Sequence, residues 1–256
     1  MIPGLAISSL DIPNALEAFR DAPAGLLDAR VLQRRIDRKY LLPRRQLEPL
    51  LACLIADYQV VRSAGRLAAT YDNLYFDTPD RRMYEDHRRG RGRRYKVRQR
   101  HHLDRQLSFL EIKRKDSDVR TVKARLGRPF GDSRLDEEAC AFVEQHSPFR
   151  ATVLVPQLSI AFHRATLLGT NVIERMTLDW DVELRDNGRR ERLPDMAIVE
   201  IKQASYSNLS PAVRALRALH IREGSVSKYC LATVTLADVR DNTFKPTLRA
   251  VERLSA

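Results

Sequence analysis

Lysine and arginine occupy every second position in the basic segment RRYKVRQR of this chain. The alternating cations are Arg94, Lys96, Arg98 and Arg100. Because successive side chains of a β-strand point to opposite faces, a strand here would place all of these cations on one face. Arginine binds phosphate through two parallel N–H groups, and lysine binds it as a compact charge. The spacing therefore predicts a surface that binds a phosphate-rich anion.

Other segments repeat this alternation and add a few carboxylates to the charged face. In SFLEIKRK, Glu111 and Lys113 share a face, and in RTVKAR the residues Lys123 and Arg125 do so. For one strand, a solvated outer face is the ordinary explanation. Repeated over several strands, however, such like charges repel one another unless an anion lies among them. The repetition favours a barrel with its charged face inward, which forms a cationic tunnel.

Two segments place a glutamate two residues before a lysine, Glu111 before Lys113 and Glu200 before Lys202. On a strand these side chains lie about 7 Å apart on the same face. The lysine can hold a phosphate while the carboxylate holds a divalent metal that bridges to it, since Mg²⁺ and Mn²⁺ bind carboxylate, phosphate and water oxygens. For either pair alone, a salt bridge along the strand is the commoner explanation, but several such pairs on basic strands favour the phosphate and metal site.

Hydrophobic periodicity predicts a chain made mainly of strands. The predicted strands are 33–42, 68–77, 93–101, 107–115, 119–126, 156–165, 172–183, 196–203 and 228–236. The predicted helices are 12–20, 46–58, 136–146 and 210–220. Strands of this number with short connections fit a closed antiparallel barrel or a sandwich. No repeat or linker interrupts the chain, so a single domain over residues 1–256 is expected.

The charge balance limits the class of partner. The chain has 45 Lys and Arg against 33 Asp and Glu, a net charge of +12, which predicts an anionic partner. Aromatic residues make up only 7% and are not interleaved on the basic strands, which argues against nucleic acid. No signal peptide or membrane-spanning stretch is recognised, so a cytoplasmic protein is expected. The oligomeric state is not indicated.

Eight short motifs, in order along the chain, resemble the VTC domain, the polyphosphate polymerase module within the triphosphate tunnel metalloenzymes (CYTH-like superfamily). They are RKY (38–40), YDNLYFDT (71–78), RYKVRQR (94–100), LEIKRK (110–115), FHRATL (162–167), ERMTLD (174–179), VEIK (199–202) and SKY (227–229). The resemblance covers about residues 30–236. It implies an α+β fold, an eight-stranded antiparallel β-barrel (the triphosphate tunnel fold) with helices packed outside.

The resemblance also implies an activity, a metal-dependent transfer of the γ-phosphate of ATP to a growing polyphosphate chain. ATP and inorganic polyphosphate would be the ligands, and Mn²⁺ or Mg²⁺ the cofactor. The implied catalytic residues are Lys39, Arg98, Lys113, Arg164, Arg175 and Lys202. The expected substrate-binding residues are Lys96, Lys123, Lys228, Arg94 and Arg125. Glu200 resembles the metal ligand, and Glu111 lies at the matching acidic position, where it would support the metal or order Lys113.

Two other functions use the same cations. A triphosphatase of the same fold would hydrolyse inorganic or nucleoside triphosphate with water as the acceptor. A non-catalytic sensor would bind polyphosphate or a nucleotide without a catalytic metal. The arginine-rich segment 88–94 (RRGRGRR) either guides an emerging polymer or is a solvated turn.

Overall fold

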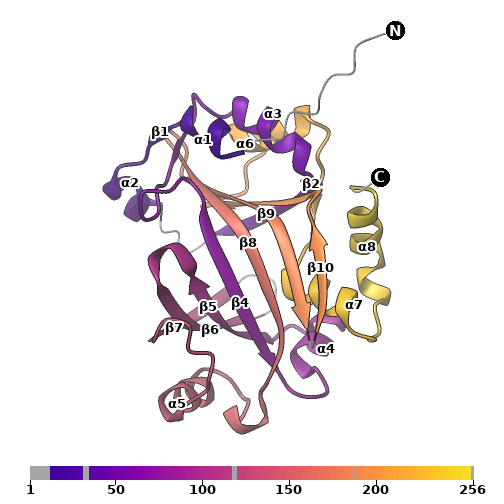
Figure 1. Ribbon diagram of the computed structural model, residues 1–256. Helices are drawn as coiled ribbons and strands as arrows, with labels where there is room; N and C mark the ends of the chain where they lie inside the picture. The colour runs from indigo at the N-terminus through magenta and orange to yellow at the C-terminus, as the bar shows by residue number, and fades with distance from the viewer. Residues whose placement is uncertain (1–11, 31–34, 117–119, 187, 255–256) are drawn as a thin grey trace. The chain divides into compact units, whose positions relative to one another are not determined.

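The computed structural model describes residues 12–30, 35–116, 120–186 and 188–254 (Figure 1). They divide into two units whose segments alternate along the chain. Of the described residues, the first unit contains 12–30, 35–68, 165–178 and 197–224, and the second contains 69–116, 120–164, 179–186, 188–196 and 225–254. The long strands β8 (Val155–Gly169) and β9 (Glu174–Asp186) each begin in one unit and end in the other.

The other elements of the first unit come from both halves of the chain. They are α1 (Ile12–Glu17), β1 (Arg20–Asp21), α2 (Ala24–Ala29), β2 (Ile36–Pro43), a 3-10 turn (Arg44–Gln46), α3 (Leu47–Ala52), β3 (Tyr58–Val60), β11 (Met196–Gln203), α6 (Pro211–Ala218) and β12 (Glu223–Gly224). Strand β2 pairs with β12 in antiparallel fashion, with Tyr40 opposite Glu223 and Lys39 opposite Gly224.

The second unit is built on the antiparallel strands β4 to β7. Its elements are β4 (Ala69–Asp77), α4 (Arg82–Arg88), β5 (Arg94–His102), β6 (Leu107–Asp116), β7 (Arg120–Arg128), α5 (Glu137–His146), β10 (Arg189–Leu193), α7 (Lys228–Leu236), α8 (Lys245–Glu252) and the 3-10 turns Leu103–Arg105, Ala151–Val153 and Asn242–Phe244. Strand β4 lies between β8 and β5, and the sheet continues through β6 to β7.

The expectation of eight long antiparallel strands is confirmed. Among the described residues, β2, β4, β5, β6, β7, β8, β9 and β11 have eight or more residues each. Four short strands of two to five residues, β1, β3, β10 and β12, extend them. In the described part of the chain β7 pairs with β6 alone, so the sheet is not closed at that edge.

Helix α5 packs on the apolar face of β6 and β7, and Figure 1 shows the helix below these strands. Val97 of β5 and Ile112 of β6 are buried in one core with Ala139 and Val143 of the helix. Because side chains alternate along a strand, this packing leaves the lysines of β5 and β6, together with Arg94, Arg98 and Arg100, on the other face. The expectation of helices packed outside a charged inner face is confirmed for this unit.

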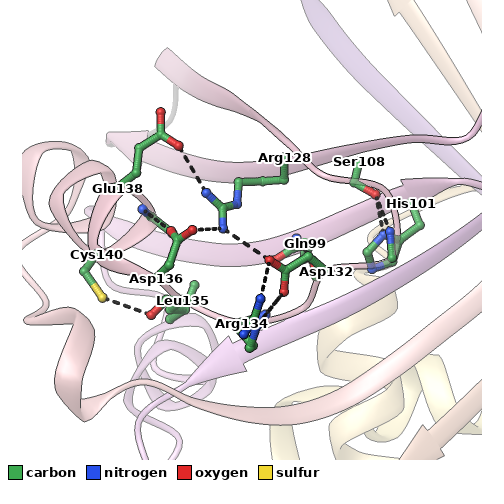
Figure 2. Close-up of polar contacts among 12 residues, drawn as sticks. Gln99, His101, Ser108, Arg128, Asp132, Arg134, Leu135, Asp136, Glu138 and Cys140 are labelled. Atoms are coloured by element: carbon green, nitrogen blue, oxygen red, sulfur yellow. Dashed lines mark hydrogen bonds and ion pairs between the residues drawn. The ribbon is translucent and has the colours of Figure 1, made fainter.

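Arg128 fixes α5 to the end of β7 (Figure 2). Its buried guanidinium donates to Asp136 over 2.6 Å and to Glu138 over 3.2 Å. Asp136 is also the N-cap of the helix, accepting the backbone N–H of Ala139 at 3.0 Å. A side-chain acceptor at this position satisfies an amide that the helix leaves unpaired. The predicted helix at 136–146 is therefore confirmed, and one arginine holds its start against the sheet.

The prediction of a strand at 228–236 is wrong, because these residues form helix α7. Ser227 is its N-cap and accepts the backbone N–H of Cys230 at 3.3 Å. The segment is rich in β-branched and aromatic residues, which favour strands in general. Its side chains, however, are buried around most of the helix, from Tyr229 to Leu236. A helix buried on most sides shows no apolar stripe by which it can be recognised.

Asp77 joins α4 and α7 to the end of β4. Its buried carboxylate accepts the backbone N–H groups of Met83 at 2.8 Å and Tyr84 at 3.0 Å, and the Tyr229 hydroxyl at 2.5 Å. Burial raises the pKa of Asp77 above its usual value, although these donors oppose the shift. The aspartate of the YDNLYFDT motif therefore has a structural role.

Candidate anion-binding site

The register of β5, β6 and β7 aligns their cations in rows across the sheet. Lys96 lies opposite Lys113, and Lys113 lies opposite Lys123. Residues directly opposite in antiparallel strands share a face, with Cβ atoms roughly 5 Å apart, and like charges in such pairs are destabilising. Three lysines in one row therefore carry a free-energy cost that a bound anion would remove.

The next row is organised around Glu111, which is only 3% exposed. Its Oε2 accepts the Arg98 Nε at 2.9 Å and the Arg98 Nη2 at 2.7 Å, and Oε1 contacts the Lys123 Nζ. Arg100 approaches to 3.8 Å. Burial opposes ionisation, but the surrounding Arg98, Arg100 and Lys123 hold the pKa of Glu111 below its usual range. One carboxylate thus faces three cations, and the row stays positive.

Strand β4 orients two of these arginines. The Tyr75 hydroxyl accepts the Arg98 Nη1 at 3.0 Å, and the Asn73 Oδ1 accepts the Arg100 Nε at 2.9 Å. Burial, reinforced by Arg98, lowers the pKa of Arg100 to about 10, so Arg100 remains charged at neutral pH. The sequence assigned no role to Tyr75 or Asn73, although their alternate positions in YDNLYFDT place them on the face of the cations.

A second carboxylate, Asp179 of β9, holds Arg164 and Lys228. Arg164 donates its Nε to Oδ1 at 2.5 Å and its Nη2 to Oδ2 at 2.7 Å, while Lys228 contacts Oδ2. Asp179 is 2% exposed, and burial favours its neutral form, but the two cations lower its pKa to about 2. The sequence analysis assigned no role in the site to Asp179, although the alternation along 174–183 places it on the charged face with Arg175.

Helix α7 brings its N-terminus to the same group of cations. Ser227, the N-cap, accepts a hydrogen bond from the Lys96 Nζ at 2.7 Å, and Lys228 is the first residue of the helix. The N-terminal end of a helix carries partial positive charge and favours anions. The wrong prediction of a strand at 228–236 therefore affects the site, because Lys228 lies at a helix N-terminus and not along a strand.

Arg125 and Arg94 are the remaining predicted substrate-binding residues of the second unit. Arg125 is exposed and its guanidinium lies 4.0 Å from the ring centroid of Phe109. Arg94 lies opposite Lys115 and donates to the Arg91 carbonyl at 3.4 Å.

The preceding arginine-rich segment has its own counter-charges. Arg88 and Arg89 pair with Glu85 at 2.8 and 3.2 Å, and Arg91 pairs with Asp86 at 3.0 Å. These ion pairs favour the interpretation of segment 88–94 as a solvated turn and argue against a role in guiding the polymer.

The first unit carries the remaining predicted residues, Lys39 on β2, Arg175 on β9, and Glu200 and Lys202 on β11. The structure joins Glu200 to Lys202 by a 2.7 Å ion pair, with side chains 20% and 19% exposed. This is the salt bridge along one strand that the spacing allowed. The partial exposure leaves both side chains able to meet a ligand.

No group of three or more His, Cys, Asp or Glu side chains within the described ranges is arranged to hold a metal ion. One protein carboxylate together with phosphate and water oxygens is a usual arrangement for Mg²⁺ and does not require such a group. Glu200 fits this arrangement better than Glu111, whose oxygens already form ion pairs with three cations.

The fold and the charged face together define the class as the triphosphate tunnel (CYTH-like) fold. The crystal structure of a putative adenylate cyclase from Bacillus halodurans is similar, with a TM-score of 0.51 and 13% identity over 77% of this chain and 95% of that one. A putative adenylyl cyclase from Hippeastrum with a dominant triphosphatase activity has a TM-score of 0.52 and 13% identity, over 78% and 96%.

Within this class the chain belongs to the VTC domain family, whose sequence model matches residues 34–237. No curated protein matches the chain. Among the helices that the structure describes, none is long and apolar enough to cross a membrane.

Proposed function

We propose that this chain is a metal-dependent polyphosphate polymerase that transfers the γ-phosphate of ATP to a growing polyphosphate chain. The family and the fold are those of enzymes that act on triphosphate compounds, which supports the general class. The observation that carries the finer proposal is the row of Lys96, Lys113 and Lys123. Three like charges across three strands suit a repeating anion better than a single phosphate group. The expected cytoplasmic location remains part of the proposal.

Phosphoryl transfer requires little covalent help from a protein, because positioning and charge neutralisation supply most of the acceleration. A terminal oxygen of the polyphosphate would attack the γ-phosphorus of ATP, the bond to the β-phosphate would break, and ADP would leave. The polymer would gain one phosphate unit. Arg98 and Arg164 are proposed to neutralise the charge at the transferring group, since guanidinium N–H groups bind two phosphate oxygens at once.

The other proposed roles are those that the family resemblance implies. Transfer is assigned to Lys39, Arg98, Lys113, Arg164, Arg175 and Lys202, and binding of the polymer to Arg94, Lys96, Lys123, Arg125 and Lys228. Glu111 and Asp179 keep several of these side chains oriented before a substrate enters. An entering phosphate would share cations that the carboxylates already hold in place, so little reorganisation is needed.

Glu200 is proposed as the carboxylate that binds Mn²⁺ or Mg²⁺, with Glu111 in a supporting role as a counter-ion. Such an ion would neutralise charge on the phosphate oxygens. Glu200→Gln should lower metal-dependent turnover about 100-fold, because the amide is a far weaker ligand for a hard cation. Binding of tripolyphosphate without metal should remain within about threefold of the parent, because the cations are intact.

The test titrates Mn²⁺ against ADP release and measures tripolyphosphate binding separately in chelator. Glu191→Gln, an exposed position on β10, is the control. An unchanged Mn²⁺ dependence in Glu200→Gln would remove Glu200 from the proposed metal site.

Phosphorus NMR of the protein with ATP and Mn²⁺ tests the activity itself. A growing signal from internal phosphoanhydride units, with ADP formed alongside, would establish a polymerase. Release of inorganic phosphate alone would establish the triphosphatase alternative. Absence of both reactions, with tight binding of tripolyphosphate, would support the non-catalytic sensor.

A further inference from the structure

A cavity of about 390 Å³ lies in the first unit, against the face of β2 that the proposed function does not use. Arg38 and Tyr40 of β2 line it, and they alternate with Lys39. Because neighbouring side chains of a strand point to opposite faces, the cavity and Lys39 lie on opposite sides of β2. Its volume is in the range of small-molecule sites.

The end of helix α6 forms one wall of the cavity. The chain turns there through His220, whose φ is 58°. The Ile221 N–H donates to the Leu216 carbonyl at 2.8 Å, and the His220 N–H to the Arg217 carbonyl at 2.9 Å. This is the hydrogen-bond pattern of a Schellman motif, usually formed with glycine. The turn places Arg217 and Arg222 at the cavity and leads into β12, which pairs with β2.

The lining of the cavity is positively charged. Arg38 is buried, pairs with Glu223 at 2.7 Å and donates to the Ser207 carbonyl at 2.9 Å, so the charge of Glu223 is compensated. Arg217 and Arg222 are exposed, and in the described residues neither forms an ion pair with a carboxylate. Three guanidinium groups against one carboxylate leave two net positive charges in the lining.

Two tyrosines complete the lining. The Tyr40 hydroxyl is buried without a hydrogen-bond partner among the described residues, which costs roughly 1–3 kcal/mol and would be relieved by an acceptor oxygen. Burial raises the pKa of Tyr40 to about 12, so the hydroxyl remains a donor. Tyr206 is 56% exposed, and the Arg38 guanidinium lies 4.5 Å from its ring centroid. An exposed ring of this size is suited to stacking on a planar ligand.

We propose that this cavity binds a nucleoside phosphate, with Arg217 and Arg222 holding the phosphate groups and Tyr206 stacking on the base. The site goes beyond the proposed function, because it uses none of the residues assigned to transfer. Guanidinium groups supply the charge and the paired N–H donors for phosphate oxygens, and an aromatic ring accepts any base. Nucleotides and free pyrophosphate share this phosphate chemistry, but only nucleotides carry a base. Comparing the two ligands therefore tests the stacking contact directly.

Calorimetric titration with ADP, in chelator to remove metal, tests the site in the full chain. The parent and Arg217→Ala/Arg222→Ala are compared, with Arg214→Ala as the matched control, an exposed arginine on the same helix outside the cavity lining. The double variant should lose one class of ADP site, or bind at that site at least tenfold more weakly, while Arg214→Ala behaves as the parent. Tyr206→Ala should weaken ADP binding and leave pyrophosphate binding unchanged.

An ADP isotherm that is the same in the parent and in the double variant would overturn the site, as would absence of ADP binding in the parent. Equal weakening of ADP and pyrophosphate by Tyr206→Ala would overturn the stacking role. Circular dichroism and melting of each variant separate these results from misfolding, and Arg217→Gln/Arg222→Gln repeats the test with smaller loss of packing. The phosphorus NMR assay is independent, so loss of the proposed function and loss of this site are distinguishable.

Discussion

Arg98→Lys is expected to lower turnover with ATP about 100- to 1,000-fold while the protein remains folded, the usual loss when one preorganised donor to the transition state is removed. Glu111 and Tyr75 fix the plane of the Arg98 guanidinium. Lysine keeps the charge but not the planar fork, so it cannot bind two phosphate oxygens in parallel. It also keeps a cation beside the buried Glu111. Alanine would remove that cation, which commonly costs about 3–5 kcal/mol of stability.

The measurement is ADP release at saturating ATP and Mn²⁺, with a thermal melt of each variant. Arg114→Lys is the matched control, because Arg114 follows Lys113 on β6, alternates to the other face and pairs with the partly exposed Asp116 at 2.8 Å. Its turnover should stay within about threefold of the parent. Turnover of Arg98→Lys within tenfold of the parent would remove Arg98 from the transfer site.

Asp179→Asn should destabilise the protein by about 3 kcal/mol at neutral pH, because Arg164 and Lys228 lose the buried charge between them. Tripolyphosphate should then raise the melting temperature of the variant more than that of the parent. The added anion supplies the missing negative charge, and a ligand that binds the folded state stabilises it. Asp21→Asn is the control, since Asp21 forms a comparable pair with Arg62 at 2.8 Å but is exposed.

The pH dependence follows from the pKa of Asp179, about 2 in the folded protein. An ordinary aspartate has a pKa of about 3.9, so this group contributes roughly 2–3 kcal/mol of stability that is present above pH ~4 and is lost as the pH falls toward ~2. The stability gap between parent and Asp179→Asn should therefore narrow over that interval. In the melting experiment, an equal rise in melting temperature of the parent and of Asp179→Asn with tripolyphosphate would show that no anion takes the place of the Asp179 carboxylate.

The strands and the charged face could be predicted because apolar and charged residues alternate along these segments with a period of two. Strand β11 was predicted at residues 196–203, its observed bounds, and Lys96 and Arg98 alternate with the buried Val97. Helix α7 was missed because tertiary packing, which buries most of its sides, overrides the local preference.

The partners of the site residues were harder to predict. Tyr75 meets Arg98 through strand pairing, and Asp179 meets Lys228 across 49 residues. Such contacts depend on register and on the path of distant segments, which local patterns do not contain. The family resemblance indicated which residues form the site, and the roles given to these residues are proposals.

The contacts of helix α7 set a lower limit on the length of chain that can fold and act. A fragment that stopped before residue 227 would deprive Asp77 of the Tyr229 hydroxyl and Lys96 of the Ser227 hydroxyl. The same cut would take Lys228 from Asp179. Helix α7 is thus an integral part of the second unit, and gene fragments for expression should extend beyond it.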